Sequence, residues 1–342
     1  MKGIGFYEHG GLGVLQPVEV PDPIAGQGEV IIRVEYCSLN HLDIFVRRGW
    51  SGLNLPKPHI PGSDVSGTIA AVGKGVTGWR VGQRVVANPG LWCGECEYCL
   101  RGEQSMCVHY GILGETTAGC YAEYVKVPAR NLMEVPDGFP MEKASAACLV
   151  SLTAWRMLKR AGLRPGETVA VVGAGGGVNT MAIQIAKLAG AKVFAATGTP
   201  EKMERAKALG VDVVVNYREE DWAKAAWLWT NRRGVDVVVD NVGKATWKQS
   251  IKALAKGGRI VTVGATSGPE AVTDIRYLFT KQISIIGSTM GTAMDFKEVM
   301  GLVWEGKLKP VIDRVLPLED AREAQRLLEE GKQFGKIVLE VK

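Results

Sequence analysis

The chain lacks an uninterrupted apolar segment long enough to cross a bilayer, and its first residues, MKGIGFYEHGG, lack the apolar centre of a secretory signal. It also lacks a basic run: 41 Lys and Arg against 36 Asp and Glu leave a net charge of only +5. Without a basic stripe or a known binding motif, nucleic acid is not an expected partner. These absences predict a cytoplasmic protein that binds neither a membrane nor a nucleic acid.

Composition and length indicate a globular protein of two domains. Hydrophobic residues make up 46% of the 342 residues and charged residues 23%, which is ordinary for a soluble fold. This length is too great for one small core. We expect residues 1–150 to form one domain and residues 151–285 a second, with residues 286–342 returning to the first.

Four of the seven cysteines follow a C-x2-C-x2-C-x7-C pattern: Cys93, Cys96, Cys99 and Cys107. Thiolates this close in sequence can surround one tetrahedral Zn²⁺, and four protein ligands leave no position for water or substrate. The alternatives are two disulfides or reduced thiols in an ordinary loop, but the one-turn spacings suit a metal better. The surrounding segment is poor in aliphatic residues, so metal would supply its stability. We therefore predict one structural zinc in a lobe at about residues 90–110.

The first half of the chain has a β-rich pattern. Short runs rich in Val and Ile occur at residues 29–39, 63–73, 83–89 and 122–128, and Gly and Pro clusters separate them. Such strands predict a barrel-like or sandwich-like domain rather than parallel βαβ units.

The pattern changes near Ser151. A helix is expected over residues 151–162, and strands and helices then alternate as far as residue 264. These strands are apolar throughout rather than alternating, as in a parallel sheet covered on both faces. The second domain is therefore predicted to be an α/β fold with a doubly wound parallel sheet. Two further helices, at about 295–305 and 319–330, and a strand from 336 close the chain.

The sequence VAVVGAGGGVN places a glycine run between the first strand and helix of this domain, with Gly173, Gly175, Gly176 and Gly177. Missing side chains permit a tight turn and let a pyrophosphate approach the backbone at the helix N-terminus. A glycine run alone can be only a turn, but here a complete βαβ unit surrounds it. We predict a dinucleotide site.

The end of the next strand favours NADP(H), with NAD as the alternative. The turn there is Thr197, Gly198 and Thr199, without the acidic residue that would hold a free ribose 2′-hydroxyl. Lys202 and Arg218 lie close in sequence and would attract a 2′-phosphate. The alternative for these two cations is a role as solvated surface charges.

Several segments together resemble the medium-chain dehydrogenase/reductase superfamily: EVIIRVEYCSLNHLDIFVRRG, PGSDVSGTIAAVGKGV, GVDVVVDNVG and GKIVLEV. The resemblance covers essentially the whole chain and includes the cysteine lobe. It implies a GroES-like catalytic domain, a Rossmann domain and a cofactor between them. Hydride would pass between nicotinamide and a carbonyl, an alcohol or a conjugated double bond. The segment SIIGSTMG resembles a strand that pairs across a dimer, so we expect a homodimer or homotetramer. The further cofactor contacts implied are His41, Thr153, Val178, Asn179, Asn241, Val242, Gly264, Ser288 and Lys336.

The departures from the superfamily concern its catalytic zinc. Zinc alcohol dehydrogenases carry a Cys where this chain has Asn40 and a His-Glu pair where it has Ser63 and Asp64; the last ligand position is kept as Cys148. Amide and hydroxyl groups are poor zinc ligands beside thiolate and imidazole. Asn40 and, three residues later, Asp43 resemble the corresponding residues of zinc-free quinone oxidoreductases. We therefore expect no catalytic zinc.

One further departure is Asn179, where the quinone oxidoreductase motif has its last glycine. This side chain would either contact the pyrophosphate or only reduce the space between the glycine turn and its neighbours.

Without a metal, the oxyanion formed during reduction needs a hydrogen-bond donor. Asn40, Ser63 or a cofactor ribose hydroxyl would serve, while Asp43 and Asp64 either tie down the catalytic cleft or have a purely structural role. The predicted activity is NADPH-dependent reduction of a quinone, an enone or an activated ketone. One alternative is a zinc alcohol dehydrogenase with atypical ligands such as Cys148 and Asp64. Another is an NADPH-binding structural or regulatory protein with little catalysis.

Overall fold

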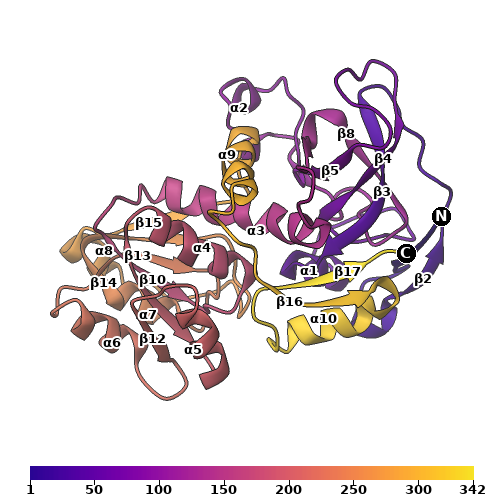
Figure 1. The fold of residues 1–342 in the computed structure, drawn as a ribbon. Helices are drawn as coiled ribbons and strands as arrows, with labels where there is room; N and C mark the ends of the chain where they lie inside the picture. Colours follow the sequence, from indigo (N-terminus) through magenta and orange to yellow (C-terminus); the bar gives the residue numbers. More distant parts are fainter. The chain divides into compact units, whose positions relative to one another are not determined.

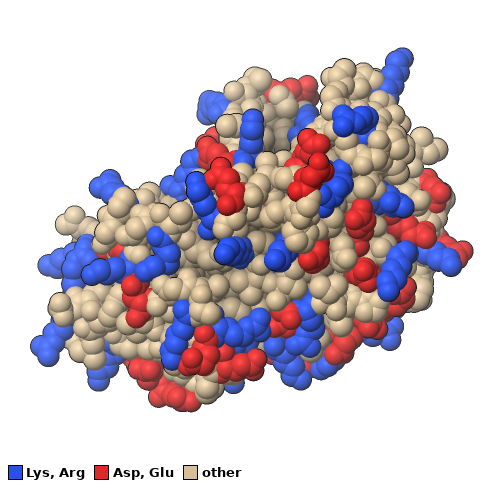
Figure 2. Space-filling model, in the orientation of Figure 1, with Lys and Arg blue, Asp and Glu red and all other residues tan.

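The computed structural model describes residues 1–342, which divide into two compact units (Figure 1). The first unit contains residues 1–149, 291–306 and 310–342, and the second contains residues 150–290 and 307–309. Acidic and basic side chains are interspersed on the face drawn in Figure 2, as the small net charge leads one to expect. None of the helices combines the length and apolar character that crossing a membrane requires.

The first unit is built on a seven-stranded sheet in the order β16-β17-β3-β4-β5-β9, with β8 paired to the other end of β3. Only the β16–β17 pair is parallel. The strands are β3 (Glu29–Ser38), β4 (Asp64–Val72), β5 (Arg84–Ala87), β8 (Tyr124–Pro128), β9 (Leu132–Glu134), β16 (Ile312–Pro317) and β17 (Lys336–Glu340). The expected β-rich, GroES-like domain is confirmed, and its four anticipated strands are β3, β4, β5 and β8.

Smaller elements complete this unit, and the β1–β2 and β6–β7 pairs are antiparallel. They are β1 (Lys2–Gly5), β2 (Gln16–Glu19), β6 (Gly90–Leu91), β7 (Gly111–Ile112), α1 (His41–Arg48), α2 (Glu97–Leu100), α9 (Ala293–Trp304), α10 (Ala321–Glu329) and the 3-10 helices Leu12–Val14, Gln104–Met106, Ala129–Asn131 and Leu318–Asp320. The apolar face of α10, with Leu327 and Leu328, packs into the same core as Ile32 of β3.

The register of the central strands decides which polar residues meet. Ser38, at the end of β3, lies opposite Asp64 on β4 and opposite Val338 on β17. The end of β3 at Ser38 and the beginnings of β4 at Asp64 and of β17 at Lys336 therefore lie together at one end of the sheet.

Helix α3 (Met141–Arg160) corrects one sequence prediction. It begins at Met141, whereas the change in pattern had suggested a start at Ser151. The intervening segment KASAACLV contains three alanines, which have the highest helix propensity, so the helix extends through it. Ser151 is consequently a buried residue in the interior of the helix.

The second unit is the expected doubly wound domain. Its six strands are all parallel, in the order β12-β11-β10-β13-β14-β15, and α-helices pack on the sheet (Figure 1). Numbered within the domain this order is 3-2-1-4-5-6, which is the Rossmann arrangement. The strands are β10 (Thr168–Val172), β11 (Lys192–Thr197), β12 (Val213–Asn216), β13 (Val235–Asp240), β14 (Leu254–Thr262) and β15 (Ser284–Gly287).

The helices of this unit are α4 (Gly177–Leu188), α5 (Pro200–Lys207), α6 (Trp222–Trp229), α7 (Trp247–Ala253) and α8 (Ile275–Lys281). No residue of α8 is fully buried, and Tyr277 and Leu278 pack against the core only partly, so the segment has no clear apolar periodicity that would predict a helix.

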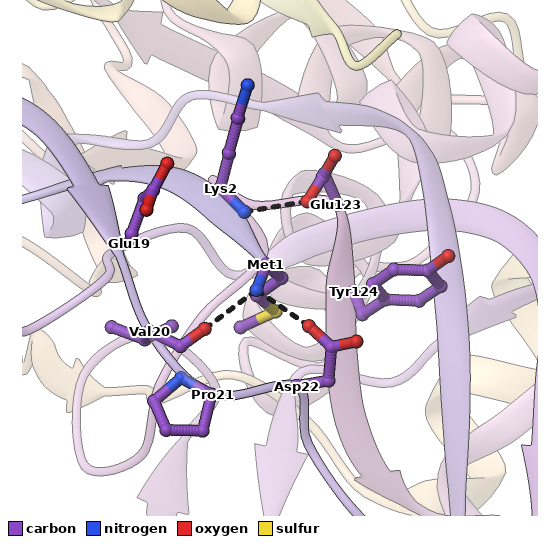
Figure 3. A pocket seen from close by; sticks show the side chains of 8 residues that line it. All are labelled: Met1, Lys2, Glu19, Val20, Pro21, Asp22, Glu123 and Tyr124. Carbon is purple, nitrogen blue, oxygen red and sulfur yellow. Dashed lines mark hydrogen bonds and ion pairs between the residues drawn. The ribbon is translucent and has the colours of Figure 1, made fainter.

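A shallow hollow of about 630 Å³ lies beside the first residues of the chain (Figure 3). The Met1 ammonium donates to Asp22 Oδ1 at 2.6 Å and to the Val20 carbonyl at 2.7 Å, and the Lys2 amide donates to Glu123 Oε2 at 2.6 Å. Its polar groups fasten the β1–β2 hairpin, and none of the predicted site residues lines it.

Candidate functional site

The glycine turn of the second unit has the geometry of an anion-binding site. Gly173 follows β10 with φ +77°, a conformation that L-residues with a side chain rarely adopt. Gly176 is the N-cap of α4 and contributes no capping side chain. The first amide groups of this twelve-residue helix, beginning at Gly177 and Val178, therefore have no side-chain acceptor and suit a pyrophosphate.

Asn179 braces this turn from beneath. Its amide nitrogen donates to the carbonyls of Val172 and Gly173 at 2.7 and 2.8 Å, and its oxygen accepts from Asn241 at 2.9 Å. The Asn241 oxygen in turn accepts from the Val263 amide at 3.2 Å. Both amide hydrogens of Asn179 are thus used inside the protein, so its influence on a cofactor would act through the shape of the turn.

The end of β11 carries the residues predicted to choose between NADP and NAD. Thr199 caps α5 by accepting from the Lys202 amide at 3.3 Å. A Cβ atom at Gly198 would lie 2.7 Å from the Tyr217 hydroxyl and 3.2 Å from Arg218 Nε. The phenol and the guanidinium therefore lie against this glycine, and the turn itself carries no carboxylate.

The remaining predicted cofactor residues fall into two groups. Thr153, Val242, Gly264 and Ser288 belong to the second unit, and the Ser288 amide donates to Thr262, the last residue of β14. Ser288 is buried, and its hydroxyl has no partner. His41 and Lys336 instead belong to the first unit.

The four clustered cysteines form a compact sulfur site. Their ligand atoms all lie within 4.8 Å of one another; Sγ of Cys93 is 3.9 Å from that of Cys99 and 3.5 Å from that of Cys107. A zinc–sulfur tetrahedron with bonds of about 2.3 Å has edges of about 3.8 Å, so the spacing fits zinc. These two contacts are far too long for disulfide bonds of about 2.05 Å.

A buried polar cluster occupies the end of the first unit's sheet where β3, β4 and β17 meet. The Lys336 ammonium donates to the Leu39 carbonyl and to Asn40 Oδ1 at 2.6 Å, and to Asp64 Oδ2 at 2.9 Å. The side chains of Lys336 and Asp64 are 3% and 0% exposed, so this is a buried ion pair.

Asp64 is the centre of this cluster. Besides Lys336, its Oδ2 accepts from the Asn40 amide at 2.9 Å and from the Ser38 hydroxyl at 3.0 Å, and its Oδ1 accepts from the Leu149 amide at 2.7 Å. Asn40 therefore uses its side-chain oxygen on Lys336 and its nitrogen on Asp64. Ser63 differs: the residue is only 1% exposed, and its buried hydroxyl has no partner.

Asp43 is fixed by neutral donors. Its Oδ2 accepts from the Asn40 backbone amide at 2.9 Å and from the Tyr121 hydroxyl at 3.0 Å, while Oδ1 has no partner. Burial raises the pKa of the Asp43 carboxyl to about 7. Burial, with a smaller contribution from Lys336, lowers the pKa of His41 to about 4, which leaves that imidazole neutral near pH 7.

Known proteins match the chain over nearly its whole length. Residues 26–137 match the "Alcohol dehydrogenase GroES-like domain" family and residues 177–305 the "Zinc-binding dehydrogenase" family. An acryloyl-coenzyme A reductase of Sulfurisphaera tokodaii is 36% identical over 324 residues, 94% of this chain and 95% of the relative. An alcohol dehydrogenase of Geobacillus stearothermophilus is 36% identical over 331 residues, 96% of each chain. The crystal structure of an NAD-dependent alcohol dehydrogenase superposes with a TM-score of 0.97 at 48% identity, covering 100% of both chains.

The chain belongs to the medium-chain dehydrogenase/reductase superfamily. It is therefore an oxidoreductase, as its sequence predicted.

At the positions that hold the catalytic zinc in zinc alcohol dehydrogenases, the side chains of this dehydrogenase/reductase are engaged with one another and with the backbone. Asn40 and Asp64 are bonded to an ammonium group, and the Cys148 thiol donates to the Ala144 carbonyl at 3.3 Å. Burial, followed by the Asp64 carboxylate, raises the pKa of that thiol well above its usual range.

Two cluster residues of this dehydrogenase/reductase were not found from its sequence. Tyr121, which supports Asp43, lies in a segment without a distinctive motif. Ser38 lies two residues before Asn40, and its β-strand position gave no sign that its hydroxyl meets Asp64. Pairing of β3 with β4 in the observed register was the information needed.

Proposed function

We propose that this oxidoreductase uses NADP(H) to reduce a carbonyl or conjugated acceptor, namely a quinone, an enone or an activated ketone, without a catalytic zinc. The observation that carries the proposal is the Lys336 ammonium bonded to Asn40 and Asp64, the residues at the superfamily's zinc positions. A relative named acryloyl-coenzyme A reductase, which by its name acts on a conjugated acceptor, supports the same reaction class.

The cofactor proposal rests on the second unit. The turn from Gly173 to Gly177 would hold the pyrophosphate, and Asn179 would keep the turn in shape. Arg218 and Tyr217, lying against Gly198, support recognition of the 2′-phosphate that distinguishes NADP from NAD. When bound, the reduced nicotinamide supplies the hydride.

Ser63 is the best-placed donor for the acceptor oxygen. Its hydroxyl is unpartnered, whereas the amide nitrogen of Asn40 already donates to Asp64. We therefore assign Ser63 to hydrogen-bond the oxygen that gains charge during reduction, and Asn40 to orient the surrounding groups. Oxidation of a simple alcohol would need an alkoxide, which zinc normally makes accessible near neutral pH, so an electrophilic acceptor is favoured.

We propose a purely structural zinc on Cys93, Cys96, Cys99 and Cys107, because the sulfur spacing matches a tetrahedral site closed to water. Such an ion would hold the lobe around α2 and would take no part in hydride transfer.

A zinc-dependent alcohol dehydrogenase is the second candidate. It is favoured by the relatives and solved structures that are named alcohol dehydrogenases. In that case zinc would bind Cys148 and Asp64, and Lys336 would have to leave Asp64.

Assembly into a homodimer or homotetramer is proposed from the edge of the second unit's sheet. Strand β15 has only one strand neighbour, and Ile285 on it is 41% exposed. Ile275 and Phe279 of α8 are also exposed. An unpaired edge with apolar side chains around it suits pairing with a second copy. We retain the proposal of a cytoplasmic location, where thiols are kept reduced for metal binding.

The function is tested by following NADPH oxidation with a quinone, an enone and an activated ketone, and NADP⁺ reduction with ethanol. We expect turnover with at least one electrophilic acceptor and poor oxidation of ethanol. Replacing Ser63 with Ala should lower kcat by about 10²-fold, as the loss of an oxyanion donor does, with little change in the KM for NADPH.

The matched control is Ser66→Ala, which removes a buried hydroxyl of the adjoining strand β4 that is already bonded to the Met141 carbonyl at 2.7 Å. Full turnover in Ser63→Ala would refute the assignment of that hydroxyl. Fast ethanol oxidation with no reduction of the three acceptors would refute the proposed function.

A further inference from the structure

The ammonium of Lys336 has a complete set of oxygen partners. One carboxylate, one side-chain amide and one backbone carbonyl each accept from it, at distances between 2.6 and 2.9 Å. An ammonium group has three hydrogens, so none is left over. The group is buried, and its charge is balanced by Asp64.

The same oxygens are the kinds of ligand that divalent cations bind. Asp64 supplies a carboxylate, Asn40 an amide oxygen and Leu39 a peptide oxygen, all directed at one point. Cys148 directly precedes Leu149, whose amide donates to Asp64 Oδ1 at 2.7 Å, so the cysteine lies next to this carboxylate along α3. A second positive charge at this point would be repelled by the ammonium.

Local backbone structure delivers the lysine to this point. Gly335 has φ +91°, and a Cβ atom there would lie 2.3 Å from the Val311 carbonyl oxygen, so only glycine fits. The Lys336 amide then donates to that same carbonyl at 2.8 Å, and the Leu39 amide donates to Ile337 at 2.9 Å. Gly335 and Lys336, at the start of β17, therefore place the ammonium where β3 ends and β4 begins.

We propose that Lys336 is a tethered cation that fills a latent divalent-metal site, so that Asn40, Asp64 and Cys148 bind a metal ion only when the lysine is removed. This deepens the proposed function and rests on it, because it supplies the reason for a reaction without catalytic zinc. Lys336 is a positioning residue: it neutralises Asp64 and fixes the Asn40 amide, and it does not itself touch the acceptor.

The test is metal uptake by full-length protein that already carries zinc in its cysteine lobe. Cobalt(II) is added to wild type and to Lys336→Ala, and the bound metal is counted by native mass spectrometry and by visible absorption. We expect no additional cobalt in wild type and one additional cobalt per chain in the variant, with a sulfur-to-cobalt absorption band. Cobalt should also raise the melting temperature of the variant and leave that of wild type unchanged.

Two further variants assign the ligands. Adding Asp64→Asn to Lys336→Ala should abolish the extra cobalt, and adding Cys148→Ala should remove the sulfur-to-cobalt band. The matched control is Lys342→Ala, which removes an exposed lysine just beyond the same strand and should leave cobalt uptake at the wild-type level.

Uptake of a second cobalt by wild type, or none by a folded Lys336→Ala, would overturn the inference. If Lys336→Ala does not fold even with cobalt, Lys336→Met is measured in the same way, and the same two outcomes decide. Activity is not a readout here. If the metal counts are as expected but the enzyme shows no reductase turnover, only the proposed function is refuted. If the enzyme turns over but the variant binds an unexpected number of cobalt ions, only this inference is refuted.

Discussion

Two buried aspartates of one cluster have different electrostatic environments. Asp64 faces an ammonium group and three further donors, whereas Asp43 accepts only from a backbone amide and a tyrosine hydroxyl. Burial without a paired cation favours the neutral carboxyl, which is why the pKa of Asp43 rises to about 7. The cluster thus combines one fixed ion pair with one group that titrates near neutral pH.

This difference predicts how stability depends on pH. Folded protein holds the Asp43 proton up to about pH 7, whereas unfolded chain releases it near pH 3.8, so the Asp43 contribution to stability falls as pH rises through this interval. Asp43→Asn should remove that fall. The lowered pKa of His41 has the opposite effect on the pH dependence of stability. Because His41 is present in both proteins, its contribution cancels when the stability of Asp43→Asn is subtracted from that of wild type. The free energy of unfolding is measured by urea denaturation at a series of pH values, with Asp137→Asn, at an exposed position, as the control. Parallel profiles for wild type and Asp43→Asn would contradict the account.

The proposed preference for NADPH also depends on a single residue. Arg218 lies against Gly198, in a turn where no carboxylate repels phosphate. Arg218→Ala should raise the KM for NADPH by about 10-fold or more, since a charge-assisted bond contributes about 1.5–3 kcal/mol. The KM for NADH should hardly change. Arg205→Ala, at a partly exposed position of the neighbouring helix α5, is the control. Equal effects on both cofactors would exclude recognition of the 2′-phosphate by Arg218.

At the scale of elements, β10, the glycine turn and α4 act together. The turn depends on Asn179, whose hydrogen bonds join the end of β10 to Asn241 beyond β13. Position 179 is where the resembling motif has glycine, so the side chain adds support that a glycine would lack.

Asn179→Ala should therefore loosen the turn. Loss of its buried hydrogen bonds should lower the free energy of unfolding by about 1–3 kcal/mol and raise the Kd for NADPH. Denaturant unfolding and fluorescence titration measure the two effects. Lys187→Ala, which breaks an exposed ion pair at the other end of α4, should change neither by more than a few tenths of a kcal/mol. A stable variant with wild-type NADPH affinity would show that the bracing is dispensable.

At the scale of the whole molecule, the fold was predictable because its signals are local. Apolar strands alternating with helices indicated the parallel sheet, and the glycine run between β10 and α4 lies within eleven consecutive residues. The cysteine lobe was similarly recognisable from spacing alone.

The buried polar cluster around Asp64 was only partly predictable, because its members are distant in sequence. Asn40 and Asp64 were selected from the resemblance, but Lys336 was expected to contact the cofactor. Its ammonium meets them only because β17 pairs with β3 beside β4, more than 270 residues further along the chain. No local sequence pattern predicts a contact between residues so far apart in the chain. The early start of α3 was missed for a different reason: its alanine-rich first segment contains no residue that marks a helix boundary.

The most direct test of the central claim is to count zinc per chain and follow NADPH-dependent reduction on the same sample during mild chelation. The account predicts one zinc, held by the four cysteines, and reductase turnover that does not change as loosely bound metal is removed. Two zinc ions per chain, with turnover lost as the weaker one leaves, would contradict it and make this protein a zinc-dependent alcohol dehydrogenase with atypical ligands.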